Sequence, residues 1–376
     1  CFDQDRNLII VGDSIFKISE SGNLIWKLGF GGNLTEISDV VCDSLGSVFI
    51  TGSTEDTTGI STSDSYQPIF GGKSDILLGP GLIEFCYDYS GISGDAFLTK
   101  LSSFGSVIWS TYIGGENLDF GRSIIVSDSM VVVSGMTNSI NSITTIGTFQ
   151  ELLTPNSGYG FQFIGIGGNN CPDPNQWYFC GSCQSGGYFP QPYDSCCQCA
   201  DQFVVAFTTD GQKRWGTYIG DNYTEKHGEI QFDGSRNILI GGTTYCFNNC
   251  TNTIATSYSI QSETNYGISG YVVSLDSNGN RRFGTYLPNG WDPDYMSWGG
   301  LRLNSVVCSG AQGILTTGTS NYEAGIATPG AYQTQNGFLN SGLGSGFIIS
   351  LASSELDSII NPQHKSICLS DTLKLV

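Results

Sequence analysis

Hydrophobic runs that end in small residues recur along the whole chain. Each run is followed by Gly, Ser or Thr, which is typical of a buried β-strand that ends at a turn. The copies are NLIIVGD at 7–13, SVFITGST at 47–54, MVVVSGMT at 130–137, NILIGGTT at 237–244 and GILTTGTS at 313–320. This self-similarity predicts a repeat protein in which each unit contains one glycine-ended strand.

A second pattern follows each glycine-ended strand and alternates apolar with polar residues. It consists of a period-2 strand, a polar turn and a second strand with an aromatic residue at one fixed position, and it predicts a β-hairpin. The copies are 14–32, 95–115, 201–220 and 269–288, with a degenerate copy at 345–360. The aromatic residues are Trp26, Trp109, Trp215 and Phe283.

Together the two patterns predict units of four antiparallel strands, because a short strand such as GRSIIVSD precedes the glycine-ended one. The first unit lacks this opening strand. The units lie near 1–32, 37–115, 120–220, 228–288 and 302–360. Insertions fall at two kinds of connection only, which blades around an axis tolerate. We therefore expect an all-β protein in which residues 1–361 form a β-propeller of about five units, or six.

The composition supports strands and limits the partners. The 376 residues include 51 Gly, with 39% hydrophobic, 12% aromatic and 13% charged residues, which disfavours both helices and disorder. The net charge of −19 repels phosphate backbones, so nucleic acid is not an expected partner. Solubility outside the cell or attraction of divalent cations accounts for such a surface. No apolar stretch is long enough to span a membrane.

The thirteen cysteines indicate disulfide bonds in an oxidising compartment. Most of the candidates crowd one polar, Cys-rich insertion at 167–200, and two more flank a short turn. A zinc site is the alternative, but the insertion contains no His and its adjacent cysteines suit zinc poorly. The disulfide candidates are Cys171, Cys180, Cys183, Cys196, Cys197, Cys199, Cys246 and Cys250.

Two further cysteines occupy one repeat position. Cys42 and Cys308 lie ten residues before the signature glycine of their units. The other units have Phe2, Ile125 and Phe232 at this place. Because apolar residues share the position, we expect both cysteines to be buried core thiols.

Several motifs resemble the SBBP family, the bacterial β-propeller repeat. They are DAFLTKL at 95–101, STYIGG at 110–115 and TPGAYQT at 328–334, with weaker loop matches at 63–72 and 146–151. The resemblance implies a scaffold found on exported proteins, and the family has no catalytic residues to transfer. Residues 362–376 form a linker followed by a strand that either closes the ring or begins an Ig-like module, as in exported Bacteroidota proteins. If the ring stays open, its free edge accepts a strand from another molecule.

The sequence contains no enzyme motif. His227 and His364 are the only histidines, and neither lies near a nucleophile motif. Calcium-like spacing occurs at Asp3-Gln-Asp5-Arg-Asn7 and at Asp276-Ser-Asn278-Gly-Asn280, although a hairpin turn explains both. We expect no catalytic site, no resident metal and no cofactor.

Surface chemistry suggests sugars and partners. The candidate N-linked sites are Asn33, Asn222 and Asn249, and the candidate O-linked sites are Ser14, Ser44, Thr57, Ser129, Ser358 and Thr372. Aromatic residues of the insertion offer a contact surface, or a small core of its own. They are Trp177, Tyr178, Tyr188, Phe189 and Tyr193.

The most economical interpretation is a secreted, extracellular or cell-surface structural protein that is a propeller module of a fibre, sheath or adhesin. It would act through protein–protein contacts, either with its own copies or with other surface-layer proteins. The alternative is a carbohydrate-binding propeller that uses the aromatic insertion to hold glycans. A weaker third hypothesis is a hydrolase with carboxylates on the axial channel.

Overall fold

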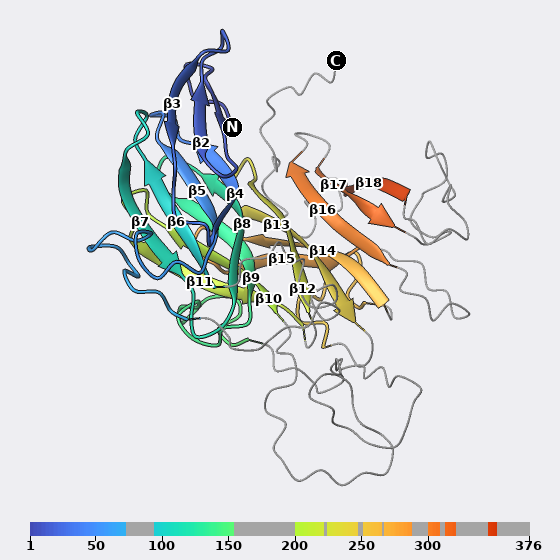
Figure 1. Cartoon of the computed structure of the whole chain (residues 1–376). Helices are drawn as coiled ribbons and strands as arrows, with labels where there is room; N and C mark the ends of the chain where they lie inside the picture. Colours follow the sequence, from blue (N-terminus) through green and yellow to red (C-terminus); the bar gives the residue numbers. More distant parts are fainter. Residues whose placement is uncertain are drawn as a thin grey trace, which may run out of the picture.

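The computed structural model of the chain is built from antiparallel β-sheets (Figure 1). It describes residues 1–72, 94–153, 200–221, 224–246, 251–264, 267–287, 300–308, 313–320 and 345–351. These ranges contain 18 strands in five sheets. Among them there is no helix of the length and hydrophobicity that a membrane crossing needs. The prediction of an all-β protein is confirmed.

Each sheet is formed by strands that are consecutive in the chain. The first sheet holds β1 (Leu8–Ile10), β2 (Ile15–Ile18) and β3 (Leu24–Leu28). The second holds β4 (Thr35–Cys42), β5 (Val48–Thr54), β6 (Asp95–Leu101) and β7 (Val107–Ile113). The third holds β8 (Asp119–Val126), β9 (Val131–Thr137), β10 (Asp201–Phe207) and β11 (Lys213–Ile219). The fourth holds β12 (Glu225–Phe232), β13 (Ile238–Cys246), β14 (Gly267–Leu275) and β15 (Arg281–Tyr286), and the fifth β16 (Leu301–Cys308), β17 (Ile314–Ser320) and β18 (Ser345–Leu351).

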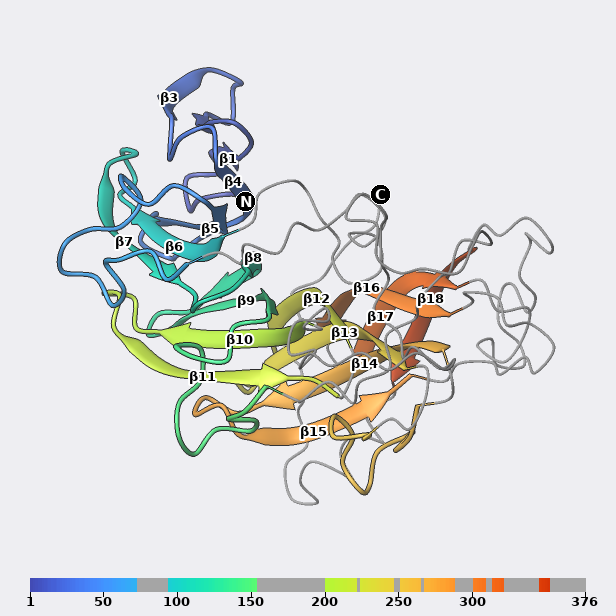
Figure 2. The same cartoon turned by 60° about the horizontal axis from the view of Figure 1, so that its bottom comes forward.

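The five sheets follow one another round an arc in chain order (Figure 2). The opening strands of neighbouring sheets lie next to each other, since β8 contacts both β4 and β12, and β12 contacts β16. Buried apolar side chains of facing sheets form a separate core at each of the four junctions. Alternate residues of a strand point to opposite faces, so a strand between two such cores is apolar on both faces.

The signature glycines lie where two strands approach most closely. Gly52, Gly135 and Gly318 each pair opposite a β-bulge in the opening strand of their sheet. A Cβ atom at these positions would stand within 2 Å of a carbonyl oxygen in that strand. The small-residue signature is therefore a consequence of strand packing.

The first sheet has only a trace of an opening strand. Phe2 forms an isolated antiparallel bridge with Leu8, and Cys1 exchanges backbone hydrogen bonds with Ile9. Residues 1–2 thus occupy the place that β4, β8, β12 and β16 fill in the other sheets. The fifth sheet has three strands within the described ranges.

Candidate functional site

A repeated contact joins each sheet to the next through an aromatic residue on the outer strand. The indole nitrogens of Trp26, Trp109 and Trp215 donate to main-chain oxygens in the hairpin turn of the following sheet. The acceptors are Ser103 at 3.0 Å, Thr209 at 3.2 Å and Ser277 at 2.8 Å. In the fourth sheet Phe283, which has no such donor, is buried in the core shared with the fifth sheet. This confirms the prediction of one shared aromatic position.

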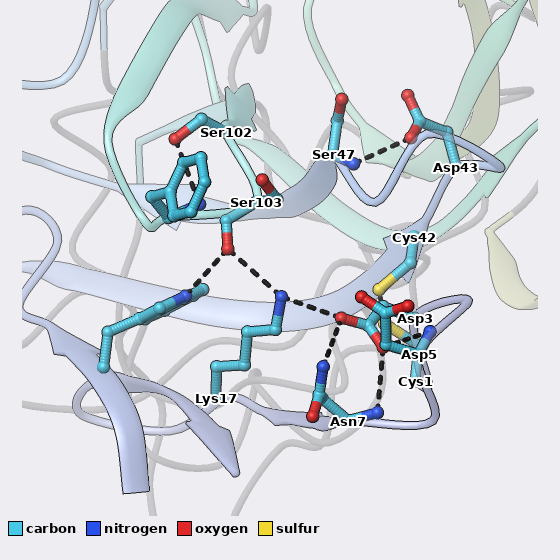
Figure 3. A network of polar contacts seen from close by, with 12 residues as sticks. Cys1, Asp3, Asp5, Asn7, Lys17, Cys42, Asp43, Ser47, Ser102 and Ser103 are labelled. Carbon is cyan, nitrogen blue, oxygen red and sulfur yellow. Dashed lines mark hydrogen bonds and ion pairs between the residues drawn. The ribbon is translucent and has the colours of Figure 1, made fainter. Parts of the chain in front are cut away.

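The junction of the first two sheets adds a buried ion pair to this contact (Figure 3). The Lys17 ammonium lies 2.7 Å from the Asp3 carboxylate and also donates to the Ser103 carbonyl, which is the acceptor of Trp26. Burial alone would raise the pKa of Asp3, but hydrogen bonds from Lys17 and Asn7 and the charge of Lys17 outweigh it and lower the pKa. Lys17, held in place by Asp3, therefore binds the first sheet to the second.

Gln67, at the end of the loop at 62–67, forms hydrogen bonds along the outer edge of the second sheet; we call this contact the glutamine clasp. Gln67 accepts a hydrogen bond from the main chain of Gly114 through Oε1 and donates to Asp95 through Nε2. Its own main chain bonds Thr111 and Tyr112 of β7. The loop thus pairs with β7 and covers part of its outer edge.

The main-chain contact of this loop recurs in the next two sheets, and the side-chain contact recurs in the third. Gln150 bonds Gly220 and Asp201 in the third sheet. In the fourth sheet the main chain of Gln261 bonds Thr285 and Tyr286, and Ser269 takes the place of the Asp. The Asp of the DAF motif and the Gln of the loop motif are therefore structural partners.

Two buried carboxyl groups meet where the second sheet joins the third. Asp95 accepts from the main chain of Gly71, whereas Asp119 accepts from Gly115, Thr137 and Ser139. Burial, followed by the charge of Asp119, raises the pKa of Asp95 to about 8. Burial raises the pKa of Asp119 to about 7. Both groups can hold a proton near neutral pH.

A second acidic junction lies between the third and fourth sheets. Asp201, Asp221 and Glu225 are all buried there, and Glu225 accepts a hydrogen bond from Thr244. Burial and then the charges of the two aspartates raise the pKa of Glu225 well above its ordinary value. Tyr286 donates its phenol proton to Asp221. Across the described ranges, no three His, Cys, Asp or Glu side chains come together as a metal centre requires.

Sequence reasoning missed these acid pairs, although a signal was present. An Asp begins the third strand of two units, as Asp95 and Asp201, and an acidic residue begins the first strand of the following unit, as Asp119 and Glu225. The members of a pair are 24 residues apart in each case and meet only when neighbouring sheets stack.

The outer edge of the first sheet lacks the loop that covers its neighbours. In the second, third and fourth sheets this loop connects the glycine-ended strand to the next one. The equivalent connection here, between β1 and β2, has only residues 11–14 and contains no glutamine that could bond β3. Leu24 and Ile25 on β3 are 60% and 48% exposed, and within the described ranges β3 pairs with β2 alone. An exposed apolar strand with an unpaired edge is an interaction surface.

The calcium-like spacings are turns. Asp3 accepts from the main chain of Asp5 and Asn7, and Asp276 accepts from Asn278 and Asn280 in the same way. In both turns the carboxylate faces N–H donors of its own loop, as in an Asx-turn. The hairpin-turn interpretation is confirmed.

The cysteine predictions have different outcomes. The six candidates in the insertion and Cys250 lie outside the described residues, as does the side chain of Cys246. The interpretation of Cys308 as a core thiol is wrong, because Cys308 is disulfide-bonded and only half-buried. Cys42 is also half-buried, and its sulfur contacts that of Cys1. These cysteines end the opening strand of a sheet, where they pack, half-buried, against a core.

The third unit requires one small correction. Its equivalent of Cys42 is Val126 and not Ile125, since Val126 pairs with the first residue of β9 as Cys42 pairs with the first residue of β5. The turn between β8 and β9 is one residue shorter than the turn between β4 and β5. A fixed sequence offset from the glycine therefore misplaces this position.

Only some of the proposed glycosylation sites lie within the described residues. Asn33, Ser44, Thr57 and Ser129 are exposed, and Ser14 is half-buried. Asn222, Asn249, Ser358 and Thr372 lie outside the described residues, as do all the aromatic residues of the insertion, residues 362–376, the TPGAYQT motif, His364 and the side chain of His227. The glycan surface and both alternatives for the tail remain predictions.

Comparison with known proteins gives a loose likeness of fold. No family model and no curated protein matches the chain. An apocarotenoid oxygenase mutant from Synechocystis is 9% identical, with a TM-score of 0.32 over 93% of this chain and 58% of its own. A lignostilbene dioxygenase from Pseudomonas brassicacearum is 10% identical, with a TM-score of 0.33 over 91% of this chain and 58% of its own. A protein of unknown function from Bacteroides caccae is 10% identical, with a TM-score of 0.19 over 74% of this chain and 93% of its own.

The chain thus spans a little over half the length of the two oxygenases. At these TM-scores the likeness is too loose to indicate an activity or a number of blades. The resemblance to the SBBP family therefore rests on the sequence motifs alone.

Proposed function

We propose that the chain is an SBBP-type β-propeller module of about five four-stranded units and acts outside the cell as a structural protein. Its task is self-association into a surface fibre or sheath through protein–protein contacts, without catalysis. The observation that carries this proposal is the open outer edge of β3. The second, third and fourth sheets each have a loop paired along their outer strand, whereas no described residue covers this edge of the first sheet.

An uncovered edge strand presents unpaired main-chain N–H and C=O groups, which a strand from another molecule can pair with. Leu24 and Ile25 add apolar side chains to the same edge. A second copy of this chain is the partner we expect. It can offer a strand of the same repeat type, with side chains that alternate in the same way.

The buried polar residues support an architectural role. Lys17 and Trp215 each bond the neighbouring sheet, whereas Asp95 and Gln67 fix a loop to their own sheet. Such bonds hold the sheets and their loops in fixed relation, which a load-transmitting module requires.

The test measures the association of the full chain by sedimentation velocity and by negative-stain microscopy. Concentration-dependent oligomers or filaments are expected for the wild type, and the double variant Leu24→Lys/Ile25→Lys should remain monomeric. A wild-type chain that stays monomeric at every concentration would overturn the proposal.

A matched control is available on the second sheet. Val107 and Ile108 of β7 occupy the same hairpin positions and are 42% and 52% exposed, but the loop at 62–67 covers part of their strand. The variant Val107→Lys/Ile108→Lys should associate like the wild type. Equal loss of association in both variants would mean that apolar area, and not the open edge of β3, drives assembly.

A further inference from the structure

Two cysteines from different sheets meet at the junction of the first and second sheets. Cys1 lies at the edge of the first sheet, where its main chain pairs with Ile9 in both directions. Cys42 is the last residue of β4 in the second sheet. Their sulfur atoms are 2.6 Å apart, and Figure 3 shows them side by side near Asp3.

The surroundings hold the two sulfur atoms in this contact. Asp3 caps the turn that follows Cys1, and Lys17 anchors Asp3 to the second sheet through Ser103. A disulfide bond needs sulfur atoms that can approach to about 2 Å, with Cα atoms in reach of each other. The thiols therefore require only a small displacement to bond.

The chain already uses this strand position for a disulfide. Cys308 ends β16 as Cys42 ends β4, and each pairs with the first residue of the next strand. Cys308 is disulfide-bonded. The end of an opening strand is half-buried at both places, so small oxidants can reach it.

We propose that Cys1 and Cys42 form a reducible disulfide that fastens the first sheet to the second. The bond forms by thiol–disulfide exchange with a small-molecule disulfide such as oxidised glutathione. The Cys1 thiolate attacks one sulfur of the oxidant and releases one thiol. Cys42 then loses its proton to water, attacks the Cys1 sulfur and releases the second thiol, so that two thiols are oxidised and one disulfide is reduced.

The order of these steps follows from the burial of Cys42. Burial raises the pKa of its thiol to about 11, so its thiolate is scarce and it reacts second. The proposal goes beyond the assembly role and does not depend on it, because it concerns a bond within one chain.

Peptide mapping tests the bond directly. The full chain, purified without reductant and treated with iodoacetamide, is digested with trypsin, which releases Cys1 in peptide 1–6 and Cys42 in peptide 28–73. We expect these two peptides to be joined, and to separate on addition of a phosphine reductant. Recovery of both cysteines in alkylated form without reduction, or of Cys1 joined to another cysteine, would overturn the proposal.

Two variants separate the bond from simple packing. Cys1→Ser and Cys42→Ser should each lower the thermal midpoint by several degrees without reductant, and the double variant should be no worse than either. In the phosphine the difference between wild type and Cys1→Ser should vanish, although other disulfides of the chain are then also reduced. A difference that persists under reduction would assign the effect to packing and contradict the proposal.

Discussion

The indole ring of Trp215 covers Gly279 in the hairpin turn of the neighbouring sheet. A Cβ atom at position 279 would stand 2.7 Å from the ring. Gly279 also has a φ of +82°, a conformation that other residues adopt only with strain. The same arrangement occurs between Trp26 and Gly105 and between Trp109 and Gly211. At each of these junctions, the close packing of a tryptophan on the next sheet therefore requires a glycine in the hairpin turn.

We expect Gly279→Ala to destabilise the protein by about 2–5 kcal/mol. The left-handed backbone contributes about 1–2 kcal/mol and the clash with Trp215 about 1–3 kcal/mol. The change in the free energy of unfolding is measured by urea denaturation monitored by tryptophan fluorescence.

Gly22 provides the control for this substitution. It occupies the same turn position in the first sheet with a φ of +84°, and a Cβ atom there would have no neighbour within 4 Å. Gly22→Ala should therefore cost only the backbone strain, about 1–2 kcal/mol. Equal costs for both variants would show that the contact with Trp215 has no energetic weight.

The sequence predicted this aromatic position because repetition and alternation act together. A period-2 strand assigns Trp26, Trp109, Trp215 and Phe283 to one face, and the repeat assigns that face to one environment. What alternation cannot supply is the partner. The carbonyl of Ser277, which accepts from Trp215, lies 62 residues away on another sheet.

The cysteines mark a second limit of sequence reasoning. Cys42, Phe232 and Cys308 share a place on the backbone, as predicted, and all three are half-buried, but Cys42 contacts Cys1 whereas Cys308 is disulfide-bonded. A repeat position fixes how a residue pairs within its sheet. Its environment depends on the neighbouring sheet, and this differs at the two ends of the arc.

Gln67→Glu should destabilise the chain by about 1–3 kcal/mol at pH 8 and by less at pH 5. The substitution removes the amide that donates to Asp95 at 3.2 Å and places a second carboxyl there. At pH 5 Asp95, whose pKa is about 8, holds a proton and donates to the new carboxylate, whereas at pH 8 about half of it is ionised and the two carboxylates repel. Thermal midpoints at the two pH values measure this difference.

Gln261→Glu is the control for that prediction. Gln261 holds the same loop position in the fourth sheet, where Ser269 stands in place of Asp95. Its effect should therefore change much less between pH 5 and pH 8. A similar pH dependence in both variants would contradict the role given to Asp95.

Lys17→Met should cost about 3–5 kcal/mol, because it leaves the Asp3 carboxylate buried without its cation. Lys100, the equivalent lysine of the second sheet, donates to the Thr209 carbonyl at 3.2 Å and contacts the ring of Phe49. Lys100→Met should accordingly cost about 1 kcal/mol. The free energy of unfolding of both variants is measured by denaturant unfolding. Equal losses would show that the ion pair with Asp3 is not the cause of the larger effect expected for Lys17→Met.

The acid pair of Asp95 and Asp119 should make the protein less stable as pH rises from about 4 to about 8. Burial raises the pKa of both groups above the ordinary value of 3.8, to about 8 and about 7. Below about pH 4 both carboxyl groups are protonated in the folded and in the unfolded chain, so the folded state pays no cost for burying their charges. Above it the unfolded chain loses protons that the folded chain retains, so the free energy of unfolding falls by roughly 1.4 kcal/mol per pH unit for each group. Asp119→Asn should flatten this slope between pH 5 and 7, whereas Asp64→Asn, which removes one charge from an exposed loop, should leave it unchanged. An unchanged slope in Asp119→Asn would assign the pH dependence to the overall negative charge of the chain.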